Sequence, residues 1–305
     1  MPIDRVEIKD FRVFKDEFTA DFCLGVNVFI GGNATGKTTL LKALYRRAKM
    51  PAFHSSIPGS PGKVIFDRGE NLIQYDGVTT TLDITKGIRP VYIPEKDILE
   101  HAKGLLTFIE QKQTGFGPEY KDVLIAAQDV PTQEQSETQK SIGQKIVAII
   151  GGNVHWDKGD GSFYTLKTDG SRIPFADEAS GYKKFGFLGL LVSSGQLESG
   201  SILFWDEPEN SLNPELVPAL VDILLELSRN GVQIFIATHS EILASYFAVN
   251  RKKDDSVMFY SLYKDGDQIK TNIGDRFDLL EPNNLTAEPV KLYKKEIERG
   301  LGGNG

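Results

Sequence analysis

The chain has 305 residues, 40% of them hydrophobic, with a formal net charge of −7 and a single cysteine, Cys23. This length can bury a large core, and the acidic charge gives no indication of nucleic-acid binding. One cysteine excludes an internal disulfide framework, and no apolar run approaches the ~20 residues of a membrane helix. The first residues do not form a secretion signal, so we expect a cytoplasmic protein without a membrane partner.

The first elements lead to a glycine-rich loop. Residues 4–24 predict two short strands, and the apolar run 26–30 predicts a buried strand. The loop Gly31-Gly-Asn-Ala-Thr-Gly-Lys-Thr38 follows directly, and apolar residues at helical spacing predict a helix over residues 38–49. The order strand, loop, helix is the context that a phosphate-binding loop requires.

This loop predicts a nucleoside triphosphate site with Mg²⁺. Glycines let backbone N–H groups curl around phosphates, and the following helix adds its partial positive charge. Lys37 is expected to reach the β- and γ-phosphates, and the Thr38 hydroxyl to ligate Mg²⁺. The alternative is a glycine-rich turn before a helix, without any ligand. The residues that we assign to nucleotide binding are Gly31, Gly32, Asn33, Ala34, Thr35, Gly36, Lys37, Thr38 and Thr39.

The next part of the chain predicts β-hairpins and then a helical arm. Residues 52–62 are expected to form a loop, and residues 63–85 alternate as hairpins do. After a strand over 91–93, the arm covers residues 97–150, and a further hairpin region covers 153–175. The helices predicted in the arm span residues 97–112, 119–127 and 134–150.

An acidic pair ends a second buried strand, in the run Ser201-Ile-Leu-Phe-Trp-Asp-Glu-Pro-Glu209. The apolar residues place Asp206 and Glu207 at the carboxyl end of a central strand, where ligands lie in open α/β sheets. Asp206 is expected to hold Mg²⁺, and Glu207 to orient and deprotonate the attacking water. The alternative is that Asp-Glu-Pro merely closes a strand at a turn.

Two further segments carry candidate site residues. The run 231–237 predicts another buried strand with His239 just past its end, where an imidazole is able to contact the γ-phosphate. Ser180 and Gly181 open an apolar helix, and Ser-Gly at a helix start is an anion site, with Ser180 as the expected N-cap. The structural alternatives are a packing histidine and a cap without a ligand.

In this order, these segments resemble the ABC-type ATPase heads, from residue 1 to about residue 272. Within that superfamily they resemble the AAA-family heads of overcoming-lysogenization-defect nucleases, recombination mediators and anti-phage systems. The resemblance rests on residues 6–14, on Asn33 in the loop, and on the segment 206–214. ABC transporters usually carry a different segment after the acidic pair. Arg12, within residues 6–14, is also assigned to nucleotide binding.

The resemblance implies a homodimer that holds two ATP molecules head to tail. Ser180 and Gly181 would then bind the γ-phosphate of the partner's ATP, with Lys183 or Lys184 nearby, and residues 211–213 would cross the interface. His239 would be the switch histidine. The sequence departs from the family pattern at Pro94-Glu95-Lys96, which has no glutamine, so Glu95 is the expected contact to a metal-bound water.

The predicted fold class is α/β: a P-loop NTPase of the ABC-ATPase type with a mostly parallel core sheet, an antiparallel β lobe and a helical arm. The core and β lobe would span residues 1–96 and 176–275, and a C-terminal helix over 289–299 would lie in the segment 276–305. A last hairpin is predicted over 256–272, with Asp265-Gly-Asp267 as its turn rather than a nuclease metal pair.

Three functions fit these motifs. The first is an ATPase subunit that controls a separate effector, a nuclease or a toxin, in bacterial anti-phage defence. The second is a DNA repair or recombination head that binds DNA ends, which the acidic charge disfavours. The third is the nucleotide-binding subunit of a transporter, which the segments around Glu95 and after Glu207 disfavour.

Overall fold

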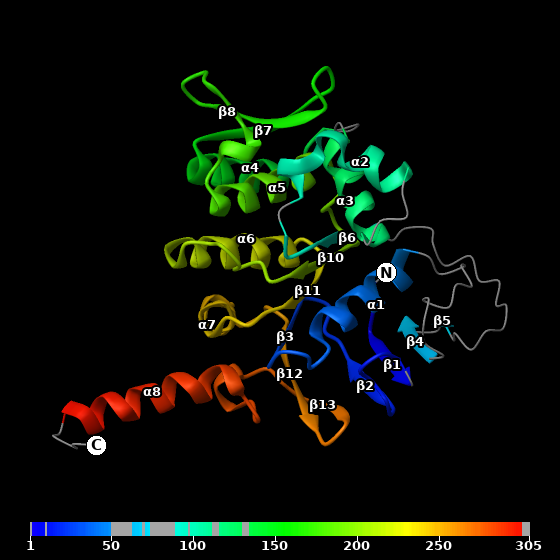
Figure 1. Cartoon of the computed structure of the whole chain (residues 1–305), viewed down its shortest axis with the longest axis vertical. Helices are drawn as coiled ribbons and strands as arrows, with labels where there is room; N and C mark the ends of the chain where they lie inside the picture. The colour runs from blue at the N-terminus through cyan, green and yellow to red at the C-terminus, as the bar shows by residue number, and fades with distance from the viewer. Residues whose placement is uncertain are drawn as a thin grey trace.

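A six-stranded sheet runs through the middle of the molecule, in the strand order β13-β12-β3-β11-β10-β6 (Figure 1). The computed structural model describes residues 2–9, 11–49, 63–68, 71–73, 89–96, 98–111, 116–129 and 134–300. All neighbouring strands of this sheet pair in parallel except β12 and β13 at its edge. The strands are β3 (Val26–Gly31), β6 (Arg89–Ile93), β10 (Ser201–Asp206), β11 (Gln233–Ala237), β12 (Val257–Asp265) and β13 (Gln268–Gly274).

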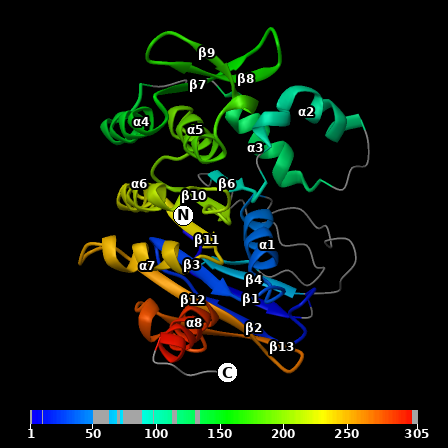
Figure 2. The same ribbon diagram turned by 60° about the vertical axis from the view of Figure 1, so that its left-hand side comes forward.

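The central strands are buried on both faces. Every residue of β3, β10 and β11 is buried, which explains why these strands read as continuous apolar runs. Side chains of β3 alternate between two core clusters: Val28 packs with α6 (Val217–Arg229) and α7 (Glu241–Asn250), and Phe29 packs with α1 (Lys37–Lys49). Figure 2 shows α1 on one side of the sheet and α6 and α7 on the other. The predicted mostly parallel α/β core is therefore confirmed.

A second, antiparallel sheet lies beside α1, in the order β2-β1-β4-β5 (Figure 1). Its strands are β1 (Arg5–Lys9), β2 (Phe18–Asp21), β4 (Lys63–Arg68) and β5 (Asn71–Ile73). The two strands predicted before the loop are present, and β4 and β5 form the first of the predicted hairpins. The predicted loop over 52–62 and the hairpin residues 74–85 lie outside the described residues.

The helical arm differs from the prediction at its helix starts. The helix predicted over 97–112 is a 3-10 turn, η1 (Leu99–His101), followed by α2 (Ala102–Gln111), which is kinked at Gly104 because this residue takes a φ of 82°. α3 (Pro118–Gln128) agrees with the prediction to within one residue at each end. α4 (Glu137–Ile150) starts later than predicted, because Ser136 and Gln139 form a capping box.

The arm continues into a small sheet and a helix. The predicted hairpin region over 153–175 is a three-stranded antiparallel sheet of β7 (Gly152–Asp157), β8 (Ser162–Lys167) and β9 (Arg172–Pro174). A 3-10 turn, η2 (Phe175–Asp177), leads from it into α5 (Ser180–Ser193). α5 packs on α4 and β7, so α5, the small sheet and the arm form one unit above the central sheet (Figure 1).

The C-terminal part consists of the predicted hairpin, β12 and β13, and a longer helix than predicted. α8 (Asn284–Gly300) starts five residues before the predicted helix and contains Pro289 in its interior. Its start is set by Asn283, whose side chain accepts a hydrogen bond from the backbone N–H of Leu285 at 3.2 Å. Within the described part of the chain, no helix has the length and apolar character that crossing a bilayer requires.

Candidate functional site

The glycine-rich loop connects β3 to α1, and two of its glycines have no room for a side chain. A Cβ atom on Gly31 would lie 2.2 Å from the carbonyl oxygen of Leu262, and one on Gly36 would lie 2.9 Å from side-chain atoms of Val13 and Phe14. Both glycines also have positive φ angles, of 145° and 93°. The loop is therefore shaped by close contacts with β12 and with the turn that follows β1.

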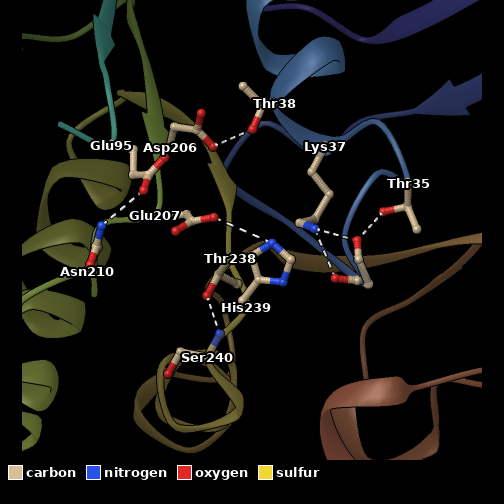
Figure 3. A network of polar contacts seen from close by, with 12 residues as sticks. Thr35, Lys37, Thr38, Glu95, Asp206, Glu207, Asn210, Thr238, His239 and Ser240 are labelled. Atoms are coloured by element: carbon tan, nitrogen blue, oxygen red, sulfur yellow. Dashed lines mark hydrogen bonds and ion pairs between the residues drawn. The ribbon is translucent and has the colours of Figure 1, made fainter. Parts of the chain in front are cut away.

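Lys37 lies inside this loop. Its ammonium donates hydrogen bonds to the carbonyl oxygens of Gly31 and Gly32 at 2.9 and 3.0 Å (Figure 3). Burial lowers the pKa of Lys37 to about 8, against the opposing effect of the Glu207 and Asp206 carboxylates. A buried ammonium beside a loop of backbone N–H groups fits an anionic, phosphate-bearing ligand.

Thr38 and Asp206 meet at the other end of the loop. The Thr38 hydroxyl donates to Oδ1 of Asp206 at 3.1 Å, and the hydroxyl of Tyr92 donates to Oδ2 at 3.1 Å. Asp206 is 4% exposed, and this burial raises its pKa, although both hydroxyls oppose the shift. No group of three or more His, Cys, Asp or Glu in the described residues is arranged to hold a metal. One hydroxyl and one carboxylate fit Mg²⁺, which keeps waters and substrate phosphates as its other ligands.

Glu207 follows β10 directly and is bonded to the end of the neighbouring strand, β11. Its backbone has a φ of 49°, and its N–H donates to the carbonyl oxygen of Ala237 at 2.8 Å. Burial raises the pKa of the Glu207 carboxyl, and the nearby carboxylates of Glu95 and Glu209 raise it further. A carboxylate whose proton affinity is raised, with its side chain 26% exposed, is suited to accept a proton from water.

His239 faces Glu207 from the end of β11. Its Nε2 lies 3.4 Å from Oε1 of Glu207 (Figure 3). Burial and the Lys37 ammonium lower the pKa of His239, so its imidazole is neutral at pH 7. Because β10 and β11 are parallel neighbours, with Asp206 opposite Ala237, the residues that follow both strands lie at the same edge of the sheet.

Glu209 links the segment after β10 to the segment after β11, and the sequence analysis did not identify it as a site residue. Its Oε1 accepts a hydrogen bond from the Thr238 hydroxyl at 2.6 Å and another from the backbone N–H of His239 at 3.0 Å. The Thr238 oxygen in turn accepts from the N–H of Ser240 at 2.8 Å. The available signal was its place in Asp-Glu-Pro-Glu, two residues after Glu207. Glu209 therefore holds the backbone that presents His239.

Glu95 lies at the same edge, after β6, but its observed partner is Asn210. The Asn210 side-chain amide donates to Oε1 of Glu95 at 3.2 Å (Figure 3). Glu95 is exposed, and its charge helps to raise the pKa of both Asp206 and Glu207. The structure thus brings Glu95 into the electrostatic surroundings of the acidic pair, with a hydrogen bond to the segment after Glu207.

The Ser180 segment lies at the start of α5, which packs on α4 of the arm (Figure 1). The predicted N-cap was wrong: Ala179 takes this position with an extended backbone and no side-chain bond, and Ser180 is the first helical residue. Lys183, expected near the γ-phosphate of the partner's ATP, is buried in its own chain. It is 6% exposed, and its ammonium contacts Oε2 of Glu100 at 2.5 Å and the carbonyl of Ala176 at 2.8 Å.

Arg12 lies in the tight turn between β1 and β2. It is exposed, with a φ of 54°, and its guanidinium lies 5.8 Å from the centre of the Phe11 ring. The following two residues, Val13 and Phe14, contact Gly36 of the loop. The structure therefore brings the Arg12 turn next to the loop, although none of the described residues forms an ion pair with Arg12.

Two protein families match parts of the chain. Residues 1–51 match the family described as "AAA ATPase domain", and residues 101–245 match the family described as "AAA domain, putative AbiEii toxin, Type IV TA system". These ranges contain the loop, the Ser180 segment, the acidic pair and His239. The family matches and the site geometry therefore involve the same residues.

Two curated proteins and one solved structure are similar over different lengths. The DNA replication and repair protein RecF of Lactobacillus gasseri is 56% identical over 45 residues, 15% of this chain and 12% of that protein. The energy-coupling factor transporter ATP-binding protein EcfA of Methanothermobacter thermautotrophicus is 32% identical over 78 residues, 26% of this chain and 24% of that protein. The chain thus spans less than a quarter of either relative.

The solved structure is an SMC head bound to the C-winged helix domain of ScpA. It has a TM-score of 0.55 at 14% identity, and the superposition covers 91% of this chain and 99% of that chain. At this identity the likeness concerns the fold alone. The chain therefore has the fold of an SMC head, and its residues 1–51 and 101–245 match AAA-family domains.

Proposed function

We propose that this protein binds and hydrolyses ATP with Mg²⁺, as a homodimer that controls a separate effector protein. The observation that carries the proposal is the meeting of four side chains at one edge of the central sheet. Thr38 lies 3.1 Å from Asp206, and Glu207 lies 3.4 Å from His239, although the four come from three separate strand ends. This set combines a metal site, a base and a phosphate-facing imidazole.

Each side chain has a role that its surroundings support. The Lys37 ammonium would bind the β- and γ-phosphates, while the Thr38 hydroxyl and the Asp206 carboxylate would hold Mg²⁺, which neutralises phosphate charge when bound. Glu207 would orient a water and take its proton, because its carboxyl has a raised pKa and an open side. His239 would contact the γ-phosphate, with its backbone held in place by Glu209.

The position of α5 supports the head-to-tail homodimer around two ATP molecules. The Ser180 segment begins α5, which stands beside the arm and apart from the loop of its own chain, so it is available to the loop of a second copy (Figure 1). A Cβ atom on Gly181 would lie 3.2 Å from the side chain of Leu212. The start of α5 and residues 211–213 therefore form one continuous surface, as an interface made by both segments requires.

The effector role is supported by a family description. The family that matches residues 101–245 is described as an AAA domain with a putative AbiEii toxin of a type IV TA system. We propose a nuclease or toxin as the effector, a role in anti-phage defence and a cytoplasmic location. We further propose that residues 1–96 and 176–275 are the nucleotide-binding core, and that residues 97–150 and 276–305 are an arm and a tail available for contacts.

A DNA repair head that binds DNA ends is the second candidate. The likeness to RecF over 45 residues and the SMC-head fold favour it. The net charge of −7 disfavours it, since DNA binding depends mainly on contacts with phosphates. This candidate predicts ATP-dependent binding to duplex DNA that weakens steeply as salt is added.

Hydrolysis is tested on the purified chain with ATP and Mg²⁺. Glu207→Gln is expected to retain ATP binding and lose ~10²-fold or more in turnover, since it removes the base. Glu137→Gln is the matched control, because Glu137 is a carboxylate on the exposed start of α4. Full turnover by Glu207→Gln would contradict the assignment of the base, and absence of ATP binding by the wild-type chain would contradict the proposed function itself.

The effector is tested by affinity purification of the Glu207→Gln protein from its native host with ATP and Mg²⁺. Mass spectrometry and nuclease digestion then identify what accompanies the protein. A stoichiometric protein partner, absent when ATP is omitted, is the expected result. A bare dimer that carries DNA would instead favour the repair head.

A further inference from the structure

The feature that the proposed mechanism leaves unused is Tyr92, on the strand next to β10. Its side chain is 1% exposed, and its hydroxyl donates to Oδ2 of Asp206 at 3.1 Å. The other oxygen, Oδ1, accepts from Thr38 at 3.1 Å. Because β6 and β10 are parallel neighbours, with Phe204 opposite Tyr92, the tyrosine reaches the strand end from within the sheet. Each oxygen of Asp206 thus has its own hydroxyl donor.

The Tyr92 ring is held by two residues of α1, one of which also contacts α3. The ring of Tyr45, on α1, packs against it with centroids 5.4 Å apart. The Lys42 ammonium, also on α1, lies 6.0 Å from the centre of the Tyr92 ring and 5.8 Å from that of Tyr120 on α3. Lys42 is further paired with the buried Glu119 of α3 at 3.3 Å. The hydroxyl therefore has a fixed position relative to α1 and α3.

The Asp206 carboxylate needs such a fixed donor. Its terminal torsion is soft, so a single hydrogen bond leaves the two oxygens free to turn about the side-chain axis. Thr38 is able to donate its hydroxyl hydrogen to Oδ1 while its lone pairs remain for a metal. The second donor, on Oδ2, then determines the plane of the carboxylate. The loss of a group that orients a metal ligand in this way typically lowers metal affinity by about 10- to 100-fold.

We propose that Tyr92 is a positioning residue of the Mg²⁺ site, whose hydroxyl fixes the orientation of the Asp206 carboxylate toward the metal. The proposal rests on the proposed function, in which Asp206 holds Mg²⁺. Its effect should be on the affinity for the metal and not on that for the nucleotide, since the Tyr92 hydroxyl bonds Asp206 and its ring packs against Tyr45 and Lys42, which lie in α1 beyond the loop. Replacing a tyrosine with only a packing role would change both the affinity for Mg²⁺ and the affinity for the nucleotide, or neither of them.

Tyr45 provides a matched control for this proposal. It is 2% exposed, its ring packs against that of Tyr92, and its hydroxyl donates to a carboxylate, Oδ2 of Asp122, at 2.6 Å. Tyr45→Phe removes a tyrosine hydroxyl from the same part of the core as Tyr92→Phe does. Asp122 lies on α3 and keeps an ion pair with Lys49 at 2.6 Å, so the control leaves the site carboxylates untouched.

The test measures binding of a fluorescent ATP analogue to the full chain, first in EDTA and then during a Mg²⁺ titration. We expect Tyr92→Phe to raise the half-saturating Mg²⁺ concentration by about 10-fold or more, as the loss of a group that orients a metal ligand does. Nucleotide affinity in EDTA should be unchanged, and Tyr45→Phe should match the wild type in both measurements. Thermal unfolding of each variant shows that it is folded.

Three outcomes separate this inference from the proposed function. If the wild-type chain binds the nucleotide without any Mg²⁺ dependence, the proposed metal site fails, and the role of Tyr92 fails with it. If the wild type depends on Mg²⁺ and Tyr92→Phe has the same half-saturation, only the role of Tyr92 is overturned. Equal shifts for Tyr92→Phe and Tyr45→Phe also overturn it, because they would reflect packing.

An isosteric variant keeps the test decisive if Tyr92→Phe does not fold. Incorporating 3-fluorotyrosine at position 92 keeps the ring and the hydroxyl and makes the hydroxyl a stronger donor. We expect it to shift the half-saturating Mg²⁺ concentration by about 2-fold or more, on the scale of a modest change in one hydrogen bond to a charged acceptor. The same substitution at position 45 should cause no shift. No shift at position 92 would overturn the proposal.

Discussion

Replacing Glu209 by glutamine and by alanine separates the hydrogen bonds of this carboxylate from its charge. Oε1 of Glu209 accepts from the Thr238 hydroxyl and from the backbone N–H of His239, at 2.6 and 3.0 Å. Its other oxygen, Oε2, is buried and has no hydrogen-bond partner among the described residues. Glutamine keeps an acceptor oxygen for both donors, whereas alanine removes it and leaves the two donors unpaired.

The expected loss in the free energy of unfolding follows from these contacts. Each hydrogen bond to a charged acceptor contributes about 1.5–3 kcal/mol, and the unpartnered buried oxygen costs about 1–3 kcal/mol, which alanine relieves. We therefore expect Glu209→Ala to lower the free energy of unfolding by about 2–3 kcal/mol, and Glu209→Gln by less than about 1 kcal/mol. Alanine also releases the backbone of His239, and a shift of ~1 Å in a catalytic group can lower turnover ~10²-fold.

Urea unfolding followed by tryptophan fluorescence measures the free energy of unfolding, and steady-state ATP hydrolysis measures turnover. Glu215→Ala, an exposed glutamate in the 3-10 turn η3 (Pro214–Leu216), is the control and should change neither. We expect Glu209→Gln to resemble the wild type and Glu209→Ala to lose both stability and turnover. Equal losses of turnover for glutamine and alanine would show that the negative charge matters, and the hydrogen-bond reasoning would then be wrong.

Three further predictions concern Lys37, the dimer and Lys183. Burial lowers the pKa of Lys37 from 10.5 to about 8, so the charged form is disfavoured in the folded chain. Lys37→Met should therefore raise the thermal midpoint at pH 7. This gain should shrink as the pH rises from about 8 toward 10.5, because the folded wild type then loses the buried charge. A gain that grows with pH would contradict this sign. Lys37→Ala and Ser180→Tyr should each be inactive, yet their mixture should regain part of the hydrolysis through one intact interfacial site, and no regain would argue against sites shared between two copies. Glu100→Ala should lower the free energy of unfolding by ~2 kcal/mol, as it leaves the Lys183 ammonium buried without its carboxylate, and an unchanged urea midpoint would show that this ammonium finds another partner.

The sequence by itself determined the local parts of the candidate site. A buried strand, a glycine-rich loop and a helix follow one another without interruption up to Lys37 and Thr38, so their geometry depends on neighbours in the chain. Asp206, Glu207 and His239 each follow an apolar run, and parallel strands of one sheet bring their carboxyl ends to one edge. The positions of these residues in the fold were therefore predictable.

Only the tertiary structure decided the contacts that hold these groups in place. Tyr92 reaches Asp206 because β6 pairs with β10 in one particular register, and no local pattern indicates which strands become neighbours. Glu209 binds the backbone of His239 because the segments after β10 and β11 converge. Lys183 turns toward Glu100 because α5 packs on the arm, where its ammonium is buried beside that carboxylate. Side-chain partners far apart in the sequence depend on strand register and helix packing, which are set by the burial of the whole core rather than by local spacing.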